Sequence, residues 1–446
     1  MNEQASQRGK WGSKLGFVLA ASGSAIGLGN IWRFPTVTGE NGGAAFVIVY
    51  LACVLLIGVP IMLAEFTIGR RAKSDPMGAF RKLAPGTLWK FVGALGVLTG
   101  LMILSYYSVV AGWTLKYITL TLTGALQGAD PDSIRTTFTD FIQSGQSVTS
   151  YHLLFMILTV WIVTGGIQGG IERAAKVLMP LLLVLLLLLV LRSVTLPGAR
   201  EGLLFYLKPD FGKITFSVVL AALGQAFFSL SLGMGAMITY GSYISEDDDL
   251  VSSAVSVSCF DALIAILAGF AIFPALFSVP GLSPNAGPGL IFVVLPNIFN
   301  AIPLGQLFGS LFFVLLAIAA LTSSISLLEV TVAYAIDQLH WKRTKAALVM
   351  GLIVFLLGVP SALSNGAVPA FSGILDVVDR YFGSISLVLG ALLLSLFVGW
   401  KWGIPSALEE IGQSRAKFGL AAVWGFLLRY ACPIAIVTIL VTILIG

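Results

Sequence analysis

Long stretches of apolar residues recur along the whole chain and are separated by short polar segments. A helix that crosses a bilayer needs about 20 mostly apolar residues, because the hydrocarbon core is about 30 Å thick. Only 11% of the 446 residues are charged, whereas a soluble domain carries about a quarter. The sequence therefore predicts an all-α, polytopic membrane protein with eleven transmembrane helices, and it excludes soluble enzymes and nucleic-acid-binding proteins. The expected spans lie near residues 15–39, 44–69, 91–124, 151–167, 172–196, 214–243, 251–278, 305–336, 346–361, 371–400 and 423–446.

Lysine and arginine gather in alternate loops of this predicted topology. The N-terminal segment and the loops near 70–90, 173–176, 342–345 and 401–417 hold most of them. Cytoplasmic loops of membrane proteins carry such an excess of positive charge, so we expect the N-terminus and these loops in the cytoplasm. An odd number of spans then puts the C-terminus outside. The polar N-terminal segment is expected to be a cytoplasmic tail and not a cleaved signal peptide.

Two of the predicted helices, the first and the sixth, contain a cluster of small and polar residues. These clusters are residues 22–30 and 228–235. Small residues in membrane helices usually serve close packing. Glycine combined with serine or asparagine at mid-membrane depth instead favours an unwound segment that lines a binding cavity. Unwound carbonyls suit a small cation, and the N-terminus of a half-helix favours a carboxylate.

The two discontinuous helices occupy corresponding positions in two sets of five spans. Because five is odd, the second set must cross the membrane with the opposite topology, which predicts a 5+5 inverted repeat. The first repeat is expected in residues 1–200 and the second in 214–400, with an eleventh helix at 423–446. All of them belong to a single transmembrane domain, 1–446.

Ionisable residues near the ends of the predicted spans form two candidate pairs. Arg33 and Asp379 are expected at similar depth on the outer side, and Arg8 and Asp337 on the cytoplasmic side. Because a charge in a membrane is costly, each needs a partner or a wet cavity. Each pair is therefore either a gate that opens and closes or a static contact at the interface.

Glu65 in the second span and Asp261 in the seventh are the remaining buried acids that we expect. A proton relay is an alternative for either of them. We prefer a structural role for Glu65, which would accept hydrogen bonds from freed amides of the broken helices, and a cation-site role for Asp261. Adjacent hydroxyls at 322–324 in the eighth span add hard oxygen ligands of the kind that a sodium site needs.

Soft metal ligands are not gathered anywhere in the sequence. Cys53, Cys259 and Cys432 lie far apart in apolar stretches, and the histidines are His152 and His340. We therefore expect no disulfide framework, no transition-metal centre and no organic cofactor. No general base lies beside a nucleophile, so an enzyme is not expected.

The first broken helix carries the most specific motif in the chain. Trp11, the run from Ala25 to Pro35 and the run from Glu40 to Gly43 resemble the first-helix signature of the neurotransmitter:sodium symporters, among them the bacterial members of the leucine-transporter type. The resemblance covers nearly the whole chain. Further similar motifs are residues 106–107 with Trp113, 170–173, 225–233, 321–324 and 376–379.

The resemblance implies sodium-coupled symport of an amino acid by alternating access, in the plasma (bacterial inner) membrane. The competing functions are a cation channel, which would conduct ions without amino acid, and an amino-acid sensor, which would bind without transport. Two Na⁺ ions would bind. The first sodium site would be formed by Ala25, Asn30, Ser229 and Asp261. The second would be formed by Gly23, Ile26, Ala319, Thr322 and Ser323.

The resemblance also implies a substrate site between the two breaks. Tyr107 would bond the substrate carboxylate and Phe228 would close above it. The outer gate would be Arg33 with Asp379, and the inner gate Arg8 with Asp337. The substrate-binding residues would be Ser24, Ala25, Leu28, Gly29, Ile103, Tyr107, Phe228, Ser229, Ser231, Met234, Ser323 and Leu327.

Three features of the sequence refine the expected specificity. The charge of Asp261 would replace the negative charge that animal members obtain from chloride, which implies chloride independence. Gly27 stands where monoamine members carry an acid, which favours an amino acid over a monoamine. Met234 can repack around different side chains, so we expect a neutral hydrophobic L-amino acid. The sequence does not define the oligomeric state.

Overall fold

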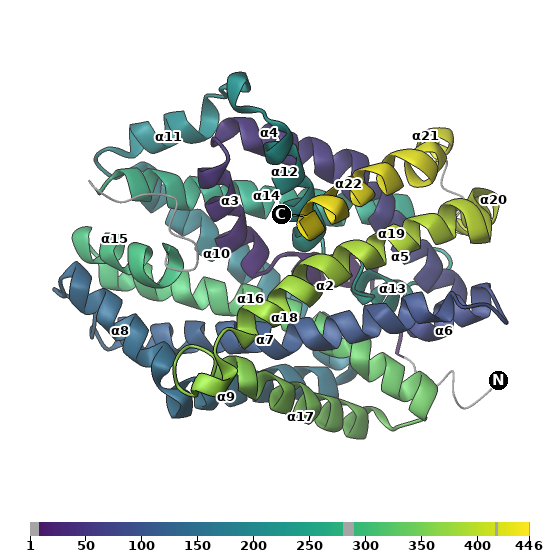
Figure 1. Cartoon of the computed structure of the whole chain (residues 1–446), viewed down its shortest axis with the longest axis horizontal. Helices are drawn as coiled ribbons and strands as arrows, with labels where there is room; N and C mark the ends of the chain where they lie inside the picture. Colours follow the sequence, from purple (N-terminus) through teal and green to yellow (C-terminus); the bar gives the residue numbers. More distant parts are fainter. Residues whose placement is uncertain (1–8, 280–289, 415–417, 446) are drawn as a thin grey trace.

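The computed structural model describes residues 9–279, 290–414 and 418–445, and in these residues the chain is all-α, as predicted. Figure 1 shows the helices packed into one bundle. The α-helices are α2 (Lys14–Ala25), α3 (Phe34–Glu40), α4 (Ala44–Cys53), α5 (Val59–Ala72), α6 (Pro76–Leu83), α7 (Lys90–Leu122), α8 (Pro131–Gln143), α9 (Gly145–Thr164), α10 (Arg173–Val194), α11 (Ala199–Leu207), α12 (Phe216–Ser229), α13 (Ala236–Gly241), α14 (Leu250–Phe277), α15 (Leu295–Ala301), α16 (Gly305–Leu339), α17 (Arg343–Ala362), α18 (Ile374–Val378), α19 (Leu387–Leu396), α20 (Ile404–Ile411), α21 (Ala421–Phe426) and α22 (Cys432–Ile445).

Short π-helical and 3₁₀ segments adjoin or interrupt these helices. The 3₁₀ turns are η4 (Phe211–Lys213), η6 (Pro369–Phe371) and η9 (Gly412–Ser414). The π-helical segments are η1 (Gly29–Arg33), η2 (Val54–Gly58), η3 (Ile167–Glu172), η5 (Leu290–Val294), η7 (Asp379–Ser386), η8 (Phe397–Gly403) and η10 (Leu427–Ala431).

The helices agree with the predicted spans. Within the described residues, nine continuous helices are long and apolar enough to cross a membrane, and the pair Lys14–Ala25 and Gly29–Glu40, bent by 52°, makes a tenth. The predicted sixth span corresponds to α12 and α13, which an irregular segment separates. The bounds differ most at the fourth helix, which spans Gly145–Thr164, and at the tenth, which continues beyond residue 400 to Ile411. Both extensions are more polar than a membrane span. Hydropathy did not predict them, because a helix can continue beyond the membrane.

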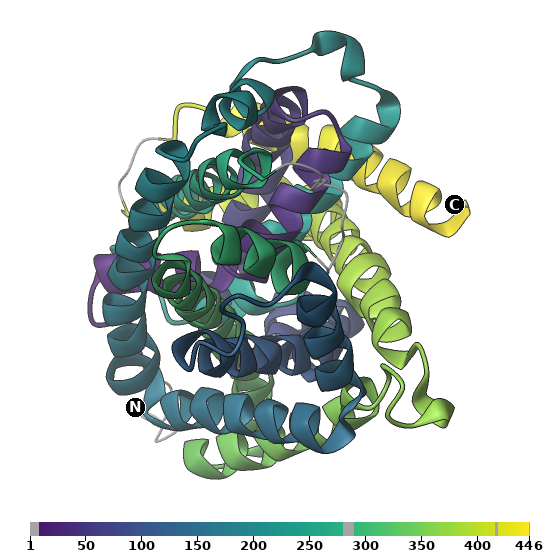
Figure 2. The same ribbon diagram turned by 90° about the vertical axis from the view of Figure 1, so that its left-hand side faces the viewer.

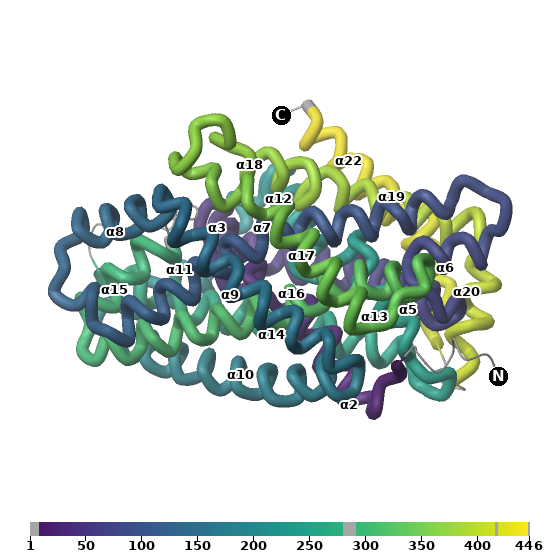
Figure 3. The backbone as a smooth tube through the Cα atoms, turned by 90° about the horizontal axis from the view of Figure 1, so that it is seen from below, coloured from purple at the N-terminus to yellow at the C-terminus, as the bar shows by residue number. Residues whose placement is uncertain are grey.

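The two longest helices, α7 and α16, form the centre of the bundle. Of their most apolar windows, 67% and 83% are buried inside the protein, whereas the corresponding share for the C-terminal helix, α21 and α22, is 22%. Figure 2 shows this C-terminal helix, in yellow, at the edge of the molecule. In Figure 3 it lies on the opposite side from α10. The central helices α7 and α16 are therefore surrounded by helices that are less buried inside the protein.

The first and the sixth helix are discontinuous, as predicted. α2 ends at Ala25, because Ile26 adopts an extended conformation with φ −76° and ψ 102°. α12 ends at Ser229 and α13 begins at Ala236, and between them Ser231, Gly233 and Gly235 have φ values of 53°, 79° and 77°. Left-handed backbone of this kind cannot continue an α-helix. Both breaks are buried at the centre of the bundle.

We expect Gly233→Ala to destabilise the protein. Gly233 has a left-handed φ of 79°, and a Cβ there would lie 2.1 Å from the carbonyl oxygen of Leu387 in α19. The backbone conformation alone costs a residue with a Cβ about 1–2 kcal/mol. Thermal unfolding of the purified protein in detergent measures the loss. Gly224→Ala in α12 is the matched control, because its Cβ would meet nothing within 4 Å. Equal melting temperatures for the two variants would contradict the prediction.

Candidate functional site

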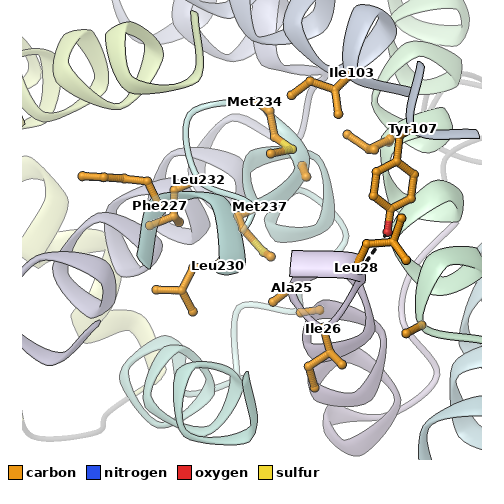
Figure 4. Packing of buried hydrophobic residues seen from close by; sticks show 14 of the residues in the cluster. Ala25, Ile26, Leu28, Ile103, Tyr107, Phe227, Leu230, Leu232, Met234 and Met237 are labelled. Atoms are coloured by element: carbon orange, nitrogen blue, oxygen red, sulfur yellow. Dashed lines mark hydrogen bonds between the residues drawn. The ribbon is translucent and has the colours of Figure 1, made fainter. Parts of the chain in front are cut away.

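A small cavity of about 30 Å³ lies between the two breaks. Ten of the twelve predicted substrate residues line it; Leu28 and Ser229 do not. Figure 4 shows the Tyr107 ring pointing toward Leu28, with Ile103 and Met234 nearby. The residues that line the cavity are Ser24, Ala25, Gly27, Gly29, Ile103, Tyr107, Phe228, Ser231, Met234, Ser323 and Leu327.

The cavity is polar on one side and apolar on the other. On the polar side the Leu28 amide donates to the Tyr107 hydroxyl at 3.2 Å, and the hydroxyls of Ser231 and Ser323 donate to the Ser24 carbonyl at 2.8 and 3.1 Å. The apolar side is formed by Ile103, Phe228, Met234 and Leu327. A cavity with one polar and one apolar side can hold an amphipathic molecule in a single orientation.

Gly27 lies where a side chain would occupy the polar end. A Cβ at this position would be 2.4 Å from the Ser323 hydroxyl and 2.8 Å from the Tyr107 hydroxyl. Real Cβ atoms do not approach other atoms so closely. The absence of a side chain at Gly27 therefore leaves both hydroxyls accessible to a small polar group in the cavity.

A buried polar cluster lies beside the cavity and joins three of the four predicted members of the first sodium site. The Asn30 amide donates to Asp261 Oδ1 at 2.7 Å, and the Ser229 hydroxyl donates to Asp261 Oδ2 at 2.7 Å. Ala25, the fourth member, is the last residue of α2 and lines the cavity. Asp261 is fully buried on α14, so its charge can act on a cation with little screening.

Tyr50, which was not predicted, completes this cluster. The Tyr50 hydroxyl donates to Asp261 Oδ2 at 3.2 Å and lies 3.3 Å from the Ser229 hydroxyl. Tyr50 belongs to α4 and is fully buried. A tyrosine in an apolar span is usually an interfacial anchor, and its place beside an acid 211 residues away depends on tertiary packing.

The five predicted members of the second sodium site lie together where the break in the first helix meets α16. The Thr322 hydroxyl donates to the Ala319 carbonyl at 3.0 Å and lies 3.5 Å from the Ile26 carbonyl oxygen. The Ser323 hydroxyl lies 3.4 Å from the carbonyl oxygens of both Gly23 and Ile26. Three carbonyls and two hydroxyls form an all-oxygen set, which suits a hard cation such as Na⁺.

Transition-metal ligands do not gather in the described part of the chain, where no group of three or more His, Cys, Asp or Glu residues could hold a metal ion. The two oxygen clusters consist instead of carbonyl, hydroxyl, amide and carboxylate oxygens, which suit a hard cation. Each combines oxygens from a helix break with oxygens of a continuous helix, which is α14 for the first cluster and α16 for the second.

Side chains from other helices form hydrogen bonds with backbone groups at both breaks. The Gly233 amide in the sixth-helix break donates to Glu65 Oε1 of α5 at 2.7 Å. In the first helix the Gly29 carbonyl, which already accepts from the Phe34 amide, also accepts from the Gln225 amide at 2.9 Å, and Gln225 was not predicted. Unbonded backbone groups are very costly in a membrane interior. These contacts therefore hold the broken segments in position.

The structure does not bring Arg33 and Asp379 within ion-pair distance of each other. Arg33 lies over the Phe228 ring, with its Cζ 4.5 Å from the ring centre. Asp379 Oδ1 accepts a hydrogen bond of 2.6 Å from the Tyr106 hydroxyl, a partner that sequence analysis missed. Gly383 makes room for this contact, because a Cβ there would lie 2.4 Å from Asp379 Oδ1 and 2.5 Å from the Tyr106 hydroxyl.

Of the predicted inner pair, Arg8 lies outside the described residues, and Asp337 accepts from the Asp75 amide at 2.7 Å. The expectation that Glu65 and Asp261 are the remaining buried acids was wrong. Glu329 in α16 is also fully buried and forms an ion pair of 2.5 Å with Arg343. The sequence shows no partner for Glu329, because Arg343 lies at the start of the next helix, α17, and meets Glu329 only in the folded protein.

The comparisons with known proteins agree on one family. The profile of the "Sodium:neurotransmitter symporter family" matches residues 8–137 and 136–446. The chain is 42% identical to the uncharacterized sodium-dependent transporter YhdH of Bacillus subtilis over 440 residues, which cover 98% of this chain and 97% of that protein. An uncharacterized sodium-dependent transporter of Haemophilus influenzae is 39% identical over 451 residues, which cover 98% of each.

A solved structure has the same fold. The crystal structure of MhsT in complex with L-phenylalanine superposes with a TM-score of 0.89 at 51% sequence identity. The match covers 98% of this chain and 99% of that chain. The fold predicted from the sequence, with its two discontinuous helices, is therefore confirmed. The bounds of the two repeats, 1–200 and 214–400, stay a prediction.

We expect Tyr50→Phe to weaken the affinity of the first oxygen cluster for Na⁺ by about tenfold. The variant keeps the ring but removes a hydrogen bond to a buried carboxylate, which is worth about 1–3 kcal/mol. Protection against thermal unfolding as a function of Na⁺ concentration measures the affinity. Tyr117→Phe is the matched control, because that hydroxyl donates to the Phe292 carbonyl at 2.8 Å, outside the cluster. An unchanged sodium dependence in Tyr50→Phe would contradict the prediction.

Proposed function

Because this chain belongs to the sodium:neurotransmitter symporter family, we propose that it takes up a neutral, hydrophobic L-amino acid together with Na⁺ by alternating access. The observation that carries the proposal is the cavity between the two breaks. It is polar on one side, apolar on the other, and lies beside two oxygen clusters. Relatives of this chain are sodium-dependent transporters, and the chain is a multi-pass membrane protein.

The polar end of the cavity suits an amino-acid carboxylate. The Tyr107 hydroxyl, which accepts from the Leu28 amide, would donate to it. None of the residues that line the cavity is charged, and Gly27 offers no acid to an amine. A substrate that carries its own carboxylate beside its ammonium group therefore fits better than a monoamine. The ammonium group would meet carbonyls of the two breaks.

The apolar wall supports a hydrophobic side chain. MhsT, which is 51% identical to this chain, was crystallised with L-phenylalanine. A benzene-sized ligand needs a cavity of about 150 Å³, whereas this one has about 30 Å³. An aromatic substrate would therefore require side chains to move. Met234 has a flexible side chain that repacks easily. The Phe228 ring, which Arg33 covers, would turn away from the cavity.

Two Na⁺ ions would bind at the oxygen clusters. The first would be held by Ala25, Asn30, Ser229 and Asp261, and it would contact the substrate carboxylate, which couples the ion to the substrate. The second would be held by Gly23, Ile26, Ala319, Thr322 and Ser323. That second cluster joins the first broken helix to α16. Loss of its ion would weaken the contact and let the first helix move away from α16, toward the inward-open state.

The charge of Asp261 would make transport independent of chloride. It lies within hydrogen-bond distance of Asn30 and Ser229, so it supplies a fixed negative charge beside the first ion. At such short distances, in a poorly screened site, one unit charge contributes a large part of the electrostatic energy that holds the ion. A bound anion is then not required.

The remaining proposals concern orientation and gating. The distribution of basic residues supports a cytoplasmic N-terminus and an outer C-terminus in a bacterial inner membrane. Arg33 and Asp379 would close the outer side and Arg8 and Asp337 the inner side, each in one half of the cycle. Glu65 would hold the sixth-helix break throughout the cycle, because its contact is with the backbone of that break.

Uptake of radiolabelled neutral amino acids into proteoliposomes tests the proposed function. We expect accumulation with an inward Na⁺ gradient and none with K⁺, with hydrophobic substrates such as phenylalanine or leucine preferred. Asn30→Ala should abolish accumulation, because it removes a side-chain ligand of the first ion. Sodium-dependent binding without accumulation would identify a sensor instead, and ion current without amino acid would identify a channel.

A second variant tests the role of Asp261. Asp261→Asn is nearly isosteric but removes the charge, so we expect uptake at least tenfold below wild type in gluconate and partial recovery in chloride. Wild-type uptake should be equal in the two anions. Loss of wild-type uptake in gluconate would refute chloride independence and leave the sodium coupling untouched.

A further inference from the structure

An apolar groove of about 470 Å³ lies on the outside of the bundle, between α9 and α17. These helices run side by side (Figure 1, Figure 3). They approach closely at Gly351, where a Cβ would lie 2.3 Å from the Val160 side chain. On either side of this contact Trp161, Leu348 and Leu352 line the groove and remain 73%, 55% and 56% exposed. The groove is independent of the transport site.

The groove faces lipid and not water. Both helices qualify as membrane spans, and only 33% and 44% of their most apolar windows are buried inside the protein. Along α17 the lining runs from Thr344 to Phe355. At a rise of 1.5 Å per residue these eleven steps cover about 16 Å, roughly half of a 30 Å hydrocarbon core. The groove therefore has the length of one leaflet.

Exposed cations stand at the end of the groove where α17 begins. Lys342 and Lys345 flank this end and are both exposed, and Lys345 Nζ lies 4.8 Å from the centre of the Trp341 ring. Arg343 is not available, because it pairs with Glu329. The sequence has no acidic residue between Asp337 and Asp376. The rim of the groove is thus positively charged where a lipid headgroup would lie.

We propose that this groove binds one acyl chain of an anionic phospholipid, with its phosphate at Lys342 and Lys345. A second copy of the chain fits less well. In a two-fold dimer with its axis along the membrane normal, these lysines would face the same lysines of the partner. Like charges then oppose the contact, whereas a phosphate is attracted by both side chains.

Native mass spectrometry of the full-length protein in mild detergent tests the proposal. Phosphatidylglycerol and phosphatidylcholine with the same acyl chains are added at equal concentration. We expect phosphatidylglycerol to be retained at least about fivefold more than phosphatidylcholine, the ratio that one lysine near a headgroup is expected to give. The double variant Lys342→Ala/Lys345→Ala should lose this preference while retaining phosphatidylcholine. Lys401→Ala, at another exposed lysine, should leave the preference unchanged.

A groove-filling variant tests the acyl-chain part of the proposal. Leu352→Trp should reduce retention of both lipids, whereas Val184→Trp on the exposed face of α10 should not. Leu348→Phe serves as a milder groove variant if Leu352→Trp is not monodisperse. Equal retention of the two lipids by the wild type, or full retention by both groove variants, would overturn the proposal. A dimer that disappears in the groove variants would identify a second copy as the occupant. Bound lipid is measured without transport, so failure of the proposed transport function would leave this test intact.

Discussion

Every backbone amide and carbonyl within a bilayer needs a hydrogen-bond partner, and two helices of this protein give up their own partners near the centre of the bundle. The breaks after Ala25 and Ser229 are tolerable because side chains from other helices take over. Glu65 accepts from the Gly233 amide, and the Tyr107 hydroxyl accepts from the Leu28 amide. The same breaks expose carbonyls of the candidate cation clusters and of the polar end of the cavity. Satisfying the backbone and building the site are thus one structural problem.

The two ends of the bundle hold their charges differently. On one side Arg70 pairs with Glu410 at 2.6 Å and Arg343 with Glu329 at 2.5 Å, and both acids are fully or almost fully buried. Near the outer candidate gate, Arg33 and Asp379 contact the Phe228 ring and the Tyr106 hydroxyl instead of each other. Breaking a buried ion pair is strongly destabilising, whereas aromatic partners can be exchanged at lower cost. In this structure, the outer pair is therefore the one that can change partners more easily.

Much of the candidate site was predictable because its ligands belong to local patterns. The breaks, the hydroxyls of Thr322 and Ser323 and the acid Asp261 each stand out within a single apolar span. Tyr50, Tyr106 and Gln225 did not, because a lone polar residue on a helix has no visible partner in the sequence. Glu329 was overlooked for the same reason. Helix ends such as the start of α9 were misplaced because hydropathy marks the membrane and not the end of the hydrogen-bonded helix.

The sequence by itself determined the number of spans, the positions of the two breaks and the family, because apolar length, glycine placement and a long motif are properties of contiguous residues. Only the tertiary structure decided which groups meet across the bundle. Asp261 with Asn30, Ser229 and Tyr50, and Tyr106 with Asp379, come from different helices far apart in the chain. Their pairing depends on helix rotation and depth, which packing sets. The size of the cavity was decided in the same way, because Met234, Phe228 and Leu327 enclose it from separate helices and turns.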